Sequence, residues 1–166
     1  MKPILDACCG SRMFWFDKQN PNVIFADIRK EDLDLNHGNR TCHIRPDKLH
    51  DFRKMDFPDN TFSLVVFDPP HLRAGLSGYM GKKYGSLEKT WPVDLKAGFD
   101  ECMRVLRPQG TLIFKWNESQ IKVSEIINIF GCEPLFGHRT LQTSKTIWMA
   151  FMKFDPDASK SVTKEL

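Results

Sequence analysis

The sequence predicts an α/β fold built on a parallel sheet. Three short apolar segments each run directly into an aspartate, and a stretch with apolar residues at helical spacing follows the third segment. Short apolar runs bounded by polar or turn residues are typical of strands buried on both faces of such a sheet. Strands that alternate with helices bring their carboxyl ends to one edge, where ligands bind in open α/β sheets. The segments with their aspartates are residues 4–5 with Asp6, residues 23–26 with Asp27, and residues 64–67 with Asp68.

Length and composition set the class of protein. The 166 residues, 41% apolar and 27% charged, are typical of one soluble globular domain with a full core. We expect this domain at residues 1–154 and a flexible tail at residues 155–166. No apolar run reaches the ~20 residues of a membrane span, and the first residues lack a signal-peptide pattern. The five cysteines include no CxxC pair, so we expect a cytoplasmic protein with neither disulfides nor a metal site.

The most informative segment ends in Asp68-Pro69-Pro70-His71. Each proline fixes its own φ, and Pro70 also restricts Pro69, so the backbone after the strand is extended and rigid. The pattern therefore predicts a carboxylate, a carbonyl and an imidazole held at the carboxyl end of a strand, which is the position of a binding site. An Asp-Pro-Pro turn that only ends the strand is the alternative.

A glycine turn follows the first expected strand, which covers residues 3–7. The turn contains Ala7, Cys8 and Gly10, and residues 12–18 are expected to begin a helix. A strand, a tight turn and a helix N-terminus together form a cradle for a nucleotide-like ligand. Neither a GxGxxG motif nor a P-loop is present, so the turn alone is a weak signal.

The spacing of the acids is a stronger signal. Asp27 lies 21 residues after the first aspartate, close to the ~20-residue separation at which an acid meets a ribose hydroxyl in βαβ units. A turn or helix-capping aspartate is the alternative. A third strand is expected at residues 51–55, followed by Asp56 and Phe57. Residues 29–46 are polar without a recognisable ligand set, which favours a solvated loop over a metal site.

The second half of the chain continues the alternation of helices and strands. Pro92 suits the first turn of a helix, where its missing N–H costs nothing. The expected elements are a helix at 92–106, a strand at 111–116, a helix capped by Ser119 and ending at 130, and two last strands at 132–138 and 146–154 joined by a polar hairpin loop.

Residues 72–91 form an expected long loop. Four glycines interrupt it, and its four basic residues accompany a single acid, Glu88. A long glycine-rich loop in a compact domain is usually functional or disordered, and this positive charge suits an anionic substrate. A solvated loop is the plainer interpretation. The residues expected to contact substrate are Arg73, Tyr79, Lys82, Lys83 and Tyr84.

These patterns together resemble the class I S-adenosylmethionine-dependent methyltransferases over residues 3–154. Residues 5–10 are similar to the first cofactor motif of that family, residues 23–27 to the second, and residues 106–112 to its helix-to-strand turn. Asp68-Pro69-Pro70-His71 is similar to the (Asp/Asn/Ser)-Pro-Pro-(Tyr/Phe/Trp) motif of the amino-methyltransferases that act on adenine N6 or cytosine N4, with histidine as the aromatic residue. The resemblance implies a Rossmann-like domain with a seven-stranded, mostly parallel sheet, an antiparallel last strand and helices on both faces.

The resemblance also implies a cofactor and a set of site residues. S-adenosyl-L-methionine is the expected cofactor, and no metal is expected. The cofactor-binding residues would be Asp6, Ala7, Cys8, Gly10, Asp27, Ile28, Asp56, Phe57 and Asp68. The catalytic residues would be Asp68, Pro69, Pro70 and His71.

The implied reaction is methyl transfer to an exocyclic amino nitrogen of a nucleic-acid base, adenine N6 in the first place. DNA is expected in preference to RNA, and no membrane partner is expected. The chain has no separate target-recognition domain, so specificity would be low or supplied by a homodimer or a separate subunit. Two alternatives stay open: N-methylation of a small molecule or protein, and a non-catalytic methyltransferase-like partner subunit.

Overall fold

The computed structural model describes residues 2–34, 41–73, 81, 83, 85–139 and 144–155. Three of the predicted substrate-contacting residues, Tyr79, Lys82 and Tyr84, lie outside this part of the chain, as does most of the expected tail. No helix within the described ranges is long and apolar enough to cross a membrane.

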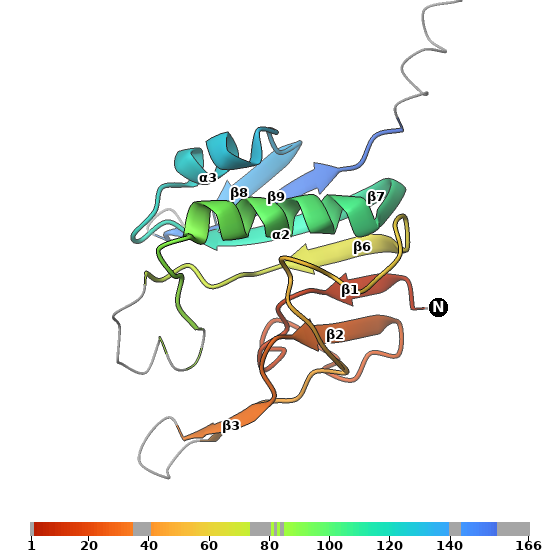
Figure 1. The fold of residues 1–166 in the computed structure, drawn as a ribbon, viewed down its shortest axis with the longest axis vertical. Coiled ribbons are helices and arrows are strands. Elements are labelled where there is room, and N and C mark those ends of the chain that lie inside the picture. Colours follow the sequence, from red (N-terminus) through yellow and green to blue (C-terminus); the bar gives the residue numbers. More distant parts are fainter. Residues whose placement is uncertain are drawn as a thin grey trace, which may run out of the picture.

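A seven-stranded sheet forms the centre of the protein, as predicted (Figure 1). Its strand order is β5-β2-β1-β6-β7-β9-β8, with β9 antiparallel to β7 and the five preceding strands parallel. The strands are β1 (Ile4–Asp6), β2 (Val23–Asp27), β5 (Lys48–Leu49), β6 (Phe62–Phe67), β7 (Leu106–Asn117), β8 (Phe136–Arg139) and β9 (Thr146–Met152).

The register of the parallel strands brings the three aspartates to one edge. Leu5 pairs with Ile24 on one side and with Val65 on the other. The ends of β1, β2 and β6 are therefore nearly level, and Asp6, Asp27 and the residue after β6 lie at the same carboxyl edge. This is the arrangement that the apolar segments predicted.

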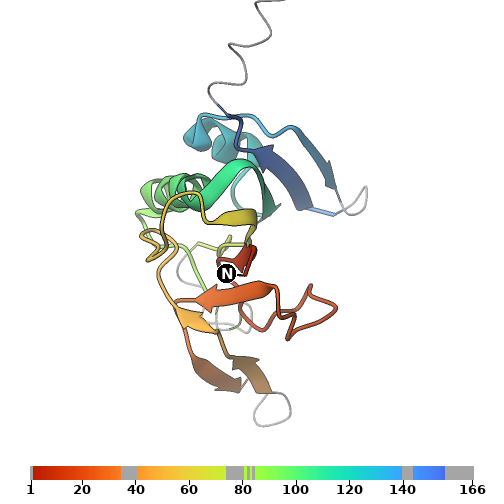
Figure 2. The ribbon, with the colours of Figure 1, turned by 90° about the vertical axis from the view of Figure 1, so that its right-hand side faces the viewer.

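Helices α2 (Trp91–Val105) and α3 (Val123–Phe130) pack against each other on the same face of the sheet (Figure 2). The rings of Phe99 and Phe130 stack at 4.1 Å between the helices, over Phe151 of β9. The start of α3 differs from the prediction, because Ser119 is held in a turn by the side chain of Asn117.

Residues 12–18 form turns and not the expected helix. Arg12 adopts a left-handed φ of 56°, which a right-handed helix cannot continue. Its guanidinium donates hydrogen bonds to the carbonyls of Lys18 and Arg45, and so folds the segment back on itself. Trp15 takes the packing position of a helix, with its ring edge-on to Phe25 of β2 at 5.2 Å.

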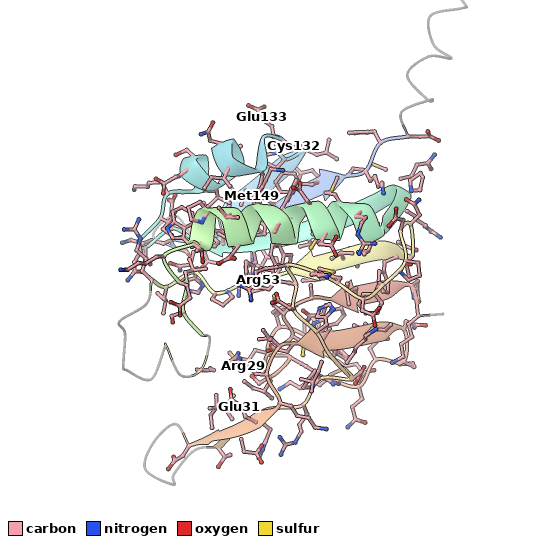
Figure 3. All side chains as sticks on the ribbon, in the orientation of Figure 1. Arg29, Glu31, Arg53, Cys132, Glu133 and Met149 are labelled. Carbon is pink, nitrogen blue, oxygen red and sulfur yellow. The ribbon has the colours of Figure 1, made fainter. Side chains whose placement is uncertain are left out.

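Residues 29–46 contain a β-hairpin where a solvated loop was expected. Strands β3 (Glu31–Asp34) and β4 (Thr41–Ile44) pair antiparallel and project from the β5 end of the molecule (Figure 1). Cys42 and Ile44 are buried while Thr41 and His43 are exposed, so β4 has the alternation of a half-buried strand. Figure 3 shows Arg29 and Glu31 close together where the hairpin leaves the sheet. Their charged groups lie 3.7 Å apart.

The third parallel strand also lies earlier in the chain than predicted. It is β5, which pairs with Ala26 and Asp27 of β2, whereas residues 51–54 form a turn closed by a bridge between Asp51 and Lys54. Two residues are too few to show a strand pattern in the sequence. The acid that follows this strand is therefore Asp51, and Asp56 comes seven residues after the strand ends.

Candidate functional site

A pocket of about 260 Å³ lies at the carboxyl edge of the sheet. It joins the glycine turn after β1, the end of β2 and the Asp-Pro-Pro-His segment after β6. The residues lining it are Ala7, Cys8, Cys9, Gly10, Ser11, Met13, Phe14, Asp27, Ile28, Arg29, Phe52, Asp68, Pro69, Pro70, His71, Lys83 and Lys115. The structure thus brings together all four predicted catalytic residues and most of the predicted cofactor-binding residues.

The carboxylate of Asp27 fixes the shape of the glycine turn. The main-chain nitrogen of Gly10 donates a hydrogen bond of 2.9 Å to Oδ2, and that of Arg29 donates one of 2.9 Å to Oδ1. Gly10 has a φ of +49°, a left-handed conformation that favours glycine. Asp27 is 5% exposed, so this acid is both part of the pocket wall and the link between β1 and β2.

Asp6 lies behind the pocket wall and does not line it. The indole of Trp15 donates a hydrogen bond of 2.7 Å to its Oδ2, and the main-chain nitrogen of Cys8 donates one of 3.3 Å to Oδ1. Burial raises the pKa of Asp6 from 3.8 to about 7, and the two hydrogen bonds oppose this rise only in part. The carboxyl group therefore titrates near neutral pH.

Asp56 and Phe57 lie outside the pocket. The Asp56 side chain is 95% exposed and pairs with Lys48 at 3.1 Å, while Phe57 packs edge-on to Phe62 at 5.1 Å. Phe52, three residues after β5, occupies the pocket wall instead. The sequence predicted the third strand at residues 51–55, later in the chain than β5. It therefore assigned Phe57 to the cofactor site, whereas Phe52 lines the pocket.

Asp68 meets Lys115 inside the pocket. In the parallel register of β6 and β7, Phe67 pairs with Phe114, so the next residue of each strand lies side by side at the edge. The Nζ of Lys115 donates a hydrogen bond of 2.5 Å to Oδ2 of Asp68. Burial raises the pKa of Asp68, and the ammonium of Lys115 opposes that rise.

His71 lines the same pocket, with its ring 6.3 Å from that of Trp116. Burial lowers the pKa of His71, with the charge of Asp68 acting against the shift. The imidazole is therefore neutral at neutral pH. A neutral flat ring can stack on another ring, and it can accept one proton.

Cys8 is the only predicted site residue with a thiol. Burial raises its pKa well above 9.0, and the nearby Asp27 and Asp6 raise it further. Because the thiolate is the nucleophilic form of cysteine, Cys8 is unsuited to covalent catalysis at neutral pH. Its role is to shape the pocket wall.

The predicted substrate-contacting residues are only partly placed by the structure. Lys83 lines the pocket but is 9% exposed, so its side chain is largely covered. Arg73 lies outside the pocket lining, and its main-chain nitrogen donates a hydrogen bond of 2.7 Å to Gln120. Tyr79, Lys82 and Tyr84 are not within the described ranges.

Several pocket residues were missed by the sequence analysis. Lys115 had a detectable signal, because it is the one charged residue inside the apolar segment 111–116. Phe14 and Met13 had none, since the segment that carries them was expected to be helical. Arg29 lies two residues after Asp27, but it begins a polar segment that was expected to be a solvated loop.

A second, more open cavity of about 590 Å³ adjoins the first and shares Gly10, Ser11, Met13 and Lys83 with it. It lies between the turn segment after β1 and strand β4. Its remaining lining residues are Arg12, Lys18, Gln19, Thr41, Cys42, His43 and Arg45. Lys18, His43 and Arg45 are exposed, so this groove is mainly basic, although Asp32 binds both His43 and Arg45.

Comparison with known proteins supports the fold. No family model matches the sequence, and no curated protein sequence is significantly similar to it. A SAM-dependent methyltransferase from Methanosarcina mazei is similar over 91% of this chain and 92% of its own, with a TM-score of 0.55 and 14% identity. The N-methyltransferase NodS from Bradyrhizobium japonicum, solved with S-adenosyl-L-homocysteine, is similar over 92% and 78%, with a TM-score of 0.55 and 15% identity. The chain therefore has the fold of the class I S-adenosylmethionine-dependent methyltransferases.

Proposed function

We propose that the protein is an S-adenosylmethionine-dependent methyltransferase that methylates an exocyclic amine of a nucleic-acid base, adenine N6 in DNA in the first place. One observation carries the proposal: the Asp68-Pro69-Pro70-His71 segment and the Gly10–Asp27 turn line one pocket at the carboxyl edge of the sheet. A site for a nucleotide-like cofactor and a site for an amine acceptor are thereby adjacent.

The pocket residues fit S-adenosylmethionine. Asp27 offers a carboxylate for ribose hydroxyls, and Ile28 and Phe52 offer an apolar wall for a flat base. The carboxyl groups of Asp6 and Asp27 lie at this end of the sheet and favour a cationic ligand. When bound, the cofactor supplies a methyl group that is already electrophilic, so the chain's main task is alignment.

Asp68 and the carbonyl of Pro69 are the proposed acceptors for the protons of the amine. An exocyclic amine is a weak nucleophile because its lone pair is delocalised into the ring. Hydrogen bonds to both protons favour a pyramidal nitrogen whose lone pair is available. The same acceptors stabilise the positive charge that develops on this nitrogen, as preorganised electrostatic groups do.

His71 is the proposed stacking partner of the acceptor ring. It lines the pocket next to Asp68, and its lowered pKa keeps the imidazole neutral. A base in a duplex cannot reach such a pocket unless it is flipped out or already unpaired. The basic groove beside the pocket offers a path for the flanking phosphates, and its exposed basic residues include Lys18 and Arg45.

The deciding experiment is a mass-spectrometric survey of nucleosides from cells that express the protein, compared with cells that express Asp68→Ala. We expect an N-methylated nucleoside, N6-methyladenine first, that is absent with the variant. Purified protein with labelled S-adenosylmethionine and single-stranded DNA should show the same difference. Transfer to proteins or small molecules, with none to DNA or RNA, would contradict the choice of acceptor while leaving the methyltransferase activity intact.

A partner subunit for specificity is also proposed. One protein with a similar fold, from Haloferax volcanii, was solved as a putative methyltransferase in complex with the Trm112 methyltransferase activator, with a TM-score of 0.53 and 13% identity. Purification of this protein from its own cells, followed by analytical ultracentrifugation, tests for a homodimer or a second subunit. A monomer that methylates DNA alone would contradict this part of the proposal.

A further inference from the structure

Lys115 occupies an unusual position for a lysine. It lies in the middle of the sheet, on β7, between Phe114 and Trp116, whose side chains are fully buried on the helix-covered face. Because side chains alternate along a strand, Lys115 points to the other face, where it lines the pocket. Its side chain is 26% exposed, so the ammonium has lost much of its water.

The ammonium of Lys115 is held between one carboxylate and two aromatic rings. Its Nζ lies 2.5 Å from Oδ2 of Asp68, 5.7 Å from the centre of the Phe14 ring and 5.6 Å from that of Trp148. The two rings meet edge-to-face at 5.5 Å and form a corner behind the ammonium. Carboxylate and ring faces both attract a cation, so Nζ has a defined place in the pocket.

A cation at this place does not help to bind the proposed cofactor. S-adenosylmethionine carries a positive sulfonium, and an ammonium in the same pocket repels it. A need to neutralise Asp68 does not explain the lysine either. Replacing both members of a buried ion pair by apolar residues often leaves the free energy of unfolding unchanged. The remaining partner in the pocket is the methyl acceptor.

We propose that Lys115 is a specificity-determining residue, which donates a hydrogen bond to the acceptor atom next to the amine that Asp68 holds. This inference rests on the proposed function and names the chemistry of the acceptor more closely. A donor and an acceptor side by side, Nζ of Lys115 and Oδ2 of Asp68, complement an edge that presents an N–H and a ring nitrogen side by side. Such an amidine-type edge is found beside N6 of adenine and beside N4 of cytosine. An amine on a plain hydrocarbon ring lacks it.

The pair opens when the substrate binds. The direct hydrogen bond between Lys115 and Asp68 is exchanged for one bond from each residue to the substrate, so neither buried charge is left without a partner. An amine without the neighbouring acceptor atom would leave the ammonium unpaired at its new place. Sites built in this way reject the incomplete substrate strongly.

The test compares methyl transfer to single-stranded DNA that carries one adenine, 1-deazaadenine or 7-deazaadenine, with wild-type protein, Lys115→Met and Lys115→Arg. A charge-assisted hydrogen bond corresponds to roughly 10–150-fold in kcat/KM. We expect kcat/KM of the wild-type protein to be lower by about this factor on one of the two analogues than on adenine. For Lys115→Met, kcat/KM on adenine should fall by the same factor, so that the variant no longer distinguishes adenine from that analogue. Lys115→Arg should recover part of the discrimination.

The controls separate this inference from a structural role and from the proposed function. Lys122→Met, on the surface before α3, should behave as wild type, and all variants should bind S-adenosylmethionine with unchanged or higher affinity. Equal activity of wild-type protein on adenine and on both analogues would overturn the inference without any variant. Undiminished discrimination by Lys115→Met would overturn it as well. Failure of wild-type protein to methylate any base would overturn the proposed function and this inference together.

Discussion

The indole nitrogen of Trp15 donates a hydrogen bond of 2.7 Å to Oδ2 of Asp6. This bond joins the turn segment after β1 to the carboxyl end of β1, and it covers a carboxyl group that is itself fully buried. Trp15 therefore does two things: it packs on β2 in place of a helix, and it partly stabilises the ionised form of Asp6. Burial raises the pKa of Asp6 and this bond offsets only part of the rise, so the acid behind the pocket titrates near neutral pH.

The affinity for S-adenosylmethionine should rise as the pH rises from 6 to 8. In the free protein Asp6 has a pKa of about 7, and a bound cation nearby favours its ionised form, so binding releases a proton. Calorimetry across this range measures the effect. The affinity for S-adenosylhomocysteine, which lacks the sulfonium charge, should change less. A pH dependence that is the same for both ligands, or that persists in Asp6→Asn, would contradict the assignment.

Asp6→Asn should be more stable than wild type above pH 7. The pKa of Asp6 is higher in the folded protein than in the unfolded chain, so the folded state loses stability as the pH rises from 3.8 to about 7. At about 1.4 kcal/mol for each pKa unit, less the hydrogen bonds that asparagine makes poorly, the gain at pH 8 should be roughly 1–4 kcal/mol. Urea unfolding at pH 4 and pH 8 checks this. A variant less stable than wild type at pH 8 would show that the charged hydrogen bonds outweigh burial.

Asp27→Ala should weaken S-adenosylmethionine binding by roughly tenfold or more, because it removes the proposed ribose contacts and releases the main-chain nitrogens of Gly10 and Arg29. Isothermal calorimetry measures the affinity. Asp100→Ala removes an acid that pairs with Lys96 on the surface of α2 and serves as the matched control. Equal affinities for the two variants would exclude Asp27 from the cofactor site.

Asp68→Ala should abolish methyl transfer and leave the cofactor affinity nearly unchanged, because Asp68 is proposed to act on the acceptor amine. His71→Phe should retain activity if the ring acts by stacking, and His71→Ala should lose more. Single-turnover assays with a fixed DNA substrate separate these effects from product release. If His71→Phe is as inactive as Asp68→Ala, proton transfer by the imidazole is the better explanation.

Lys18→Gln combined with Arg45→Gln should weaken nucleic-acid binding and reduce its salt dependence by roughly one log unit for each phosphate that is no longer neutralised. The structure makes these exposed cations of the groove a sharper test than the predicted Lys83, whose side chain is largely covered. Fluorescence anisotropy over a range of salt concentrations measures the slope. Lys96→Gln with Lys122→Gln, on the helix-covered side, is the control. Unchanged slopes in the groove variant would remove the groove from the binding surface.

Sequence alone determined the parts of this protein that depend on local pattern. Apolar runs that end in aspartate identified β1, β2 and β6, and helical spacing after Pro92 identified α2, because each signal is complete within one element. The rigid turn from Asp68 to His71 was equally local, since two prolines restrict their own backbone. The seven-stranded sheet followed from the family resemblance of these motifs.

Tertiary structure decided what local pattern cannot encode. Residues 12–18 are turns because Arg12 binds the carbonyl of Lys18 at the end of the segment and that of Arg45 from a distant part of the chain. The two-residue strand β5 exists only through its pairing with β2. Because β5 lies earlier in the chain than the predicted strand, Phe52 lines the pocket and Asp56 does not. The sequence contains no pattern that shows this strand. Lys115 and Asp68 are 47 residues apart, and their meeting depends on the register between β6 and β7. That register is set by the packing of the whole sheet, so only the folded chain could reveal the charged pair at the centre of the site.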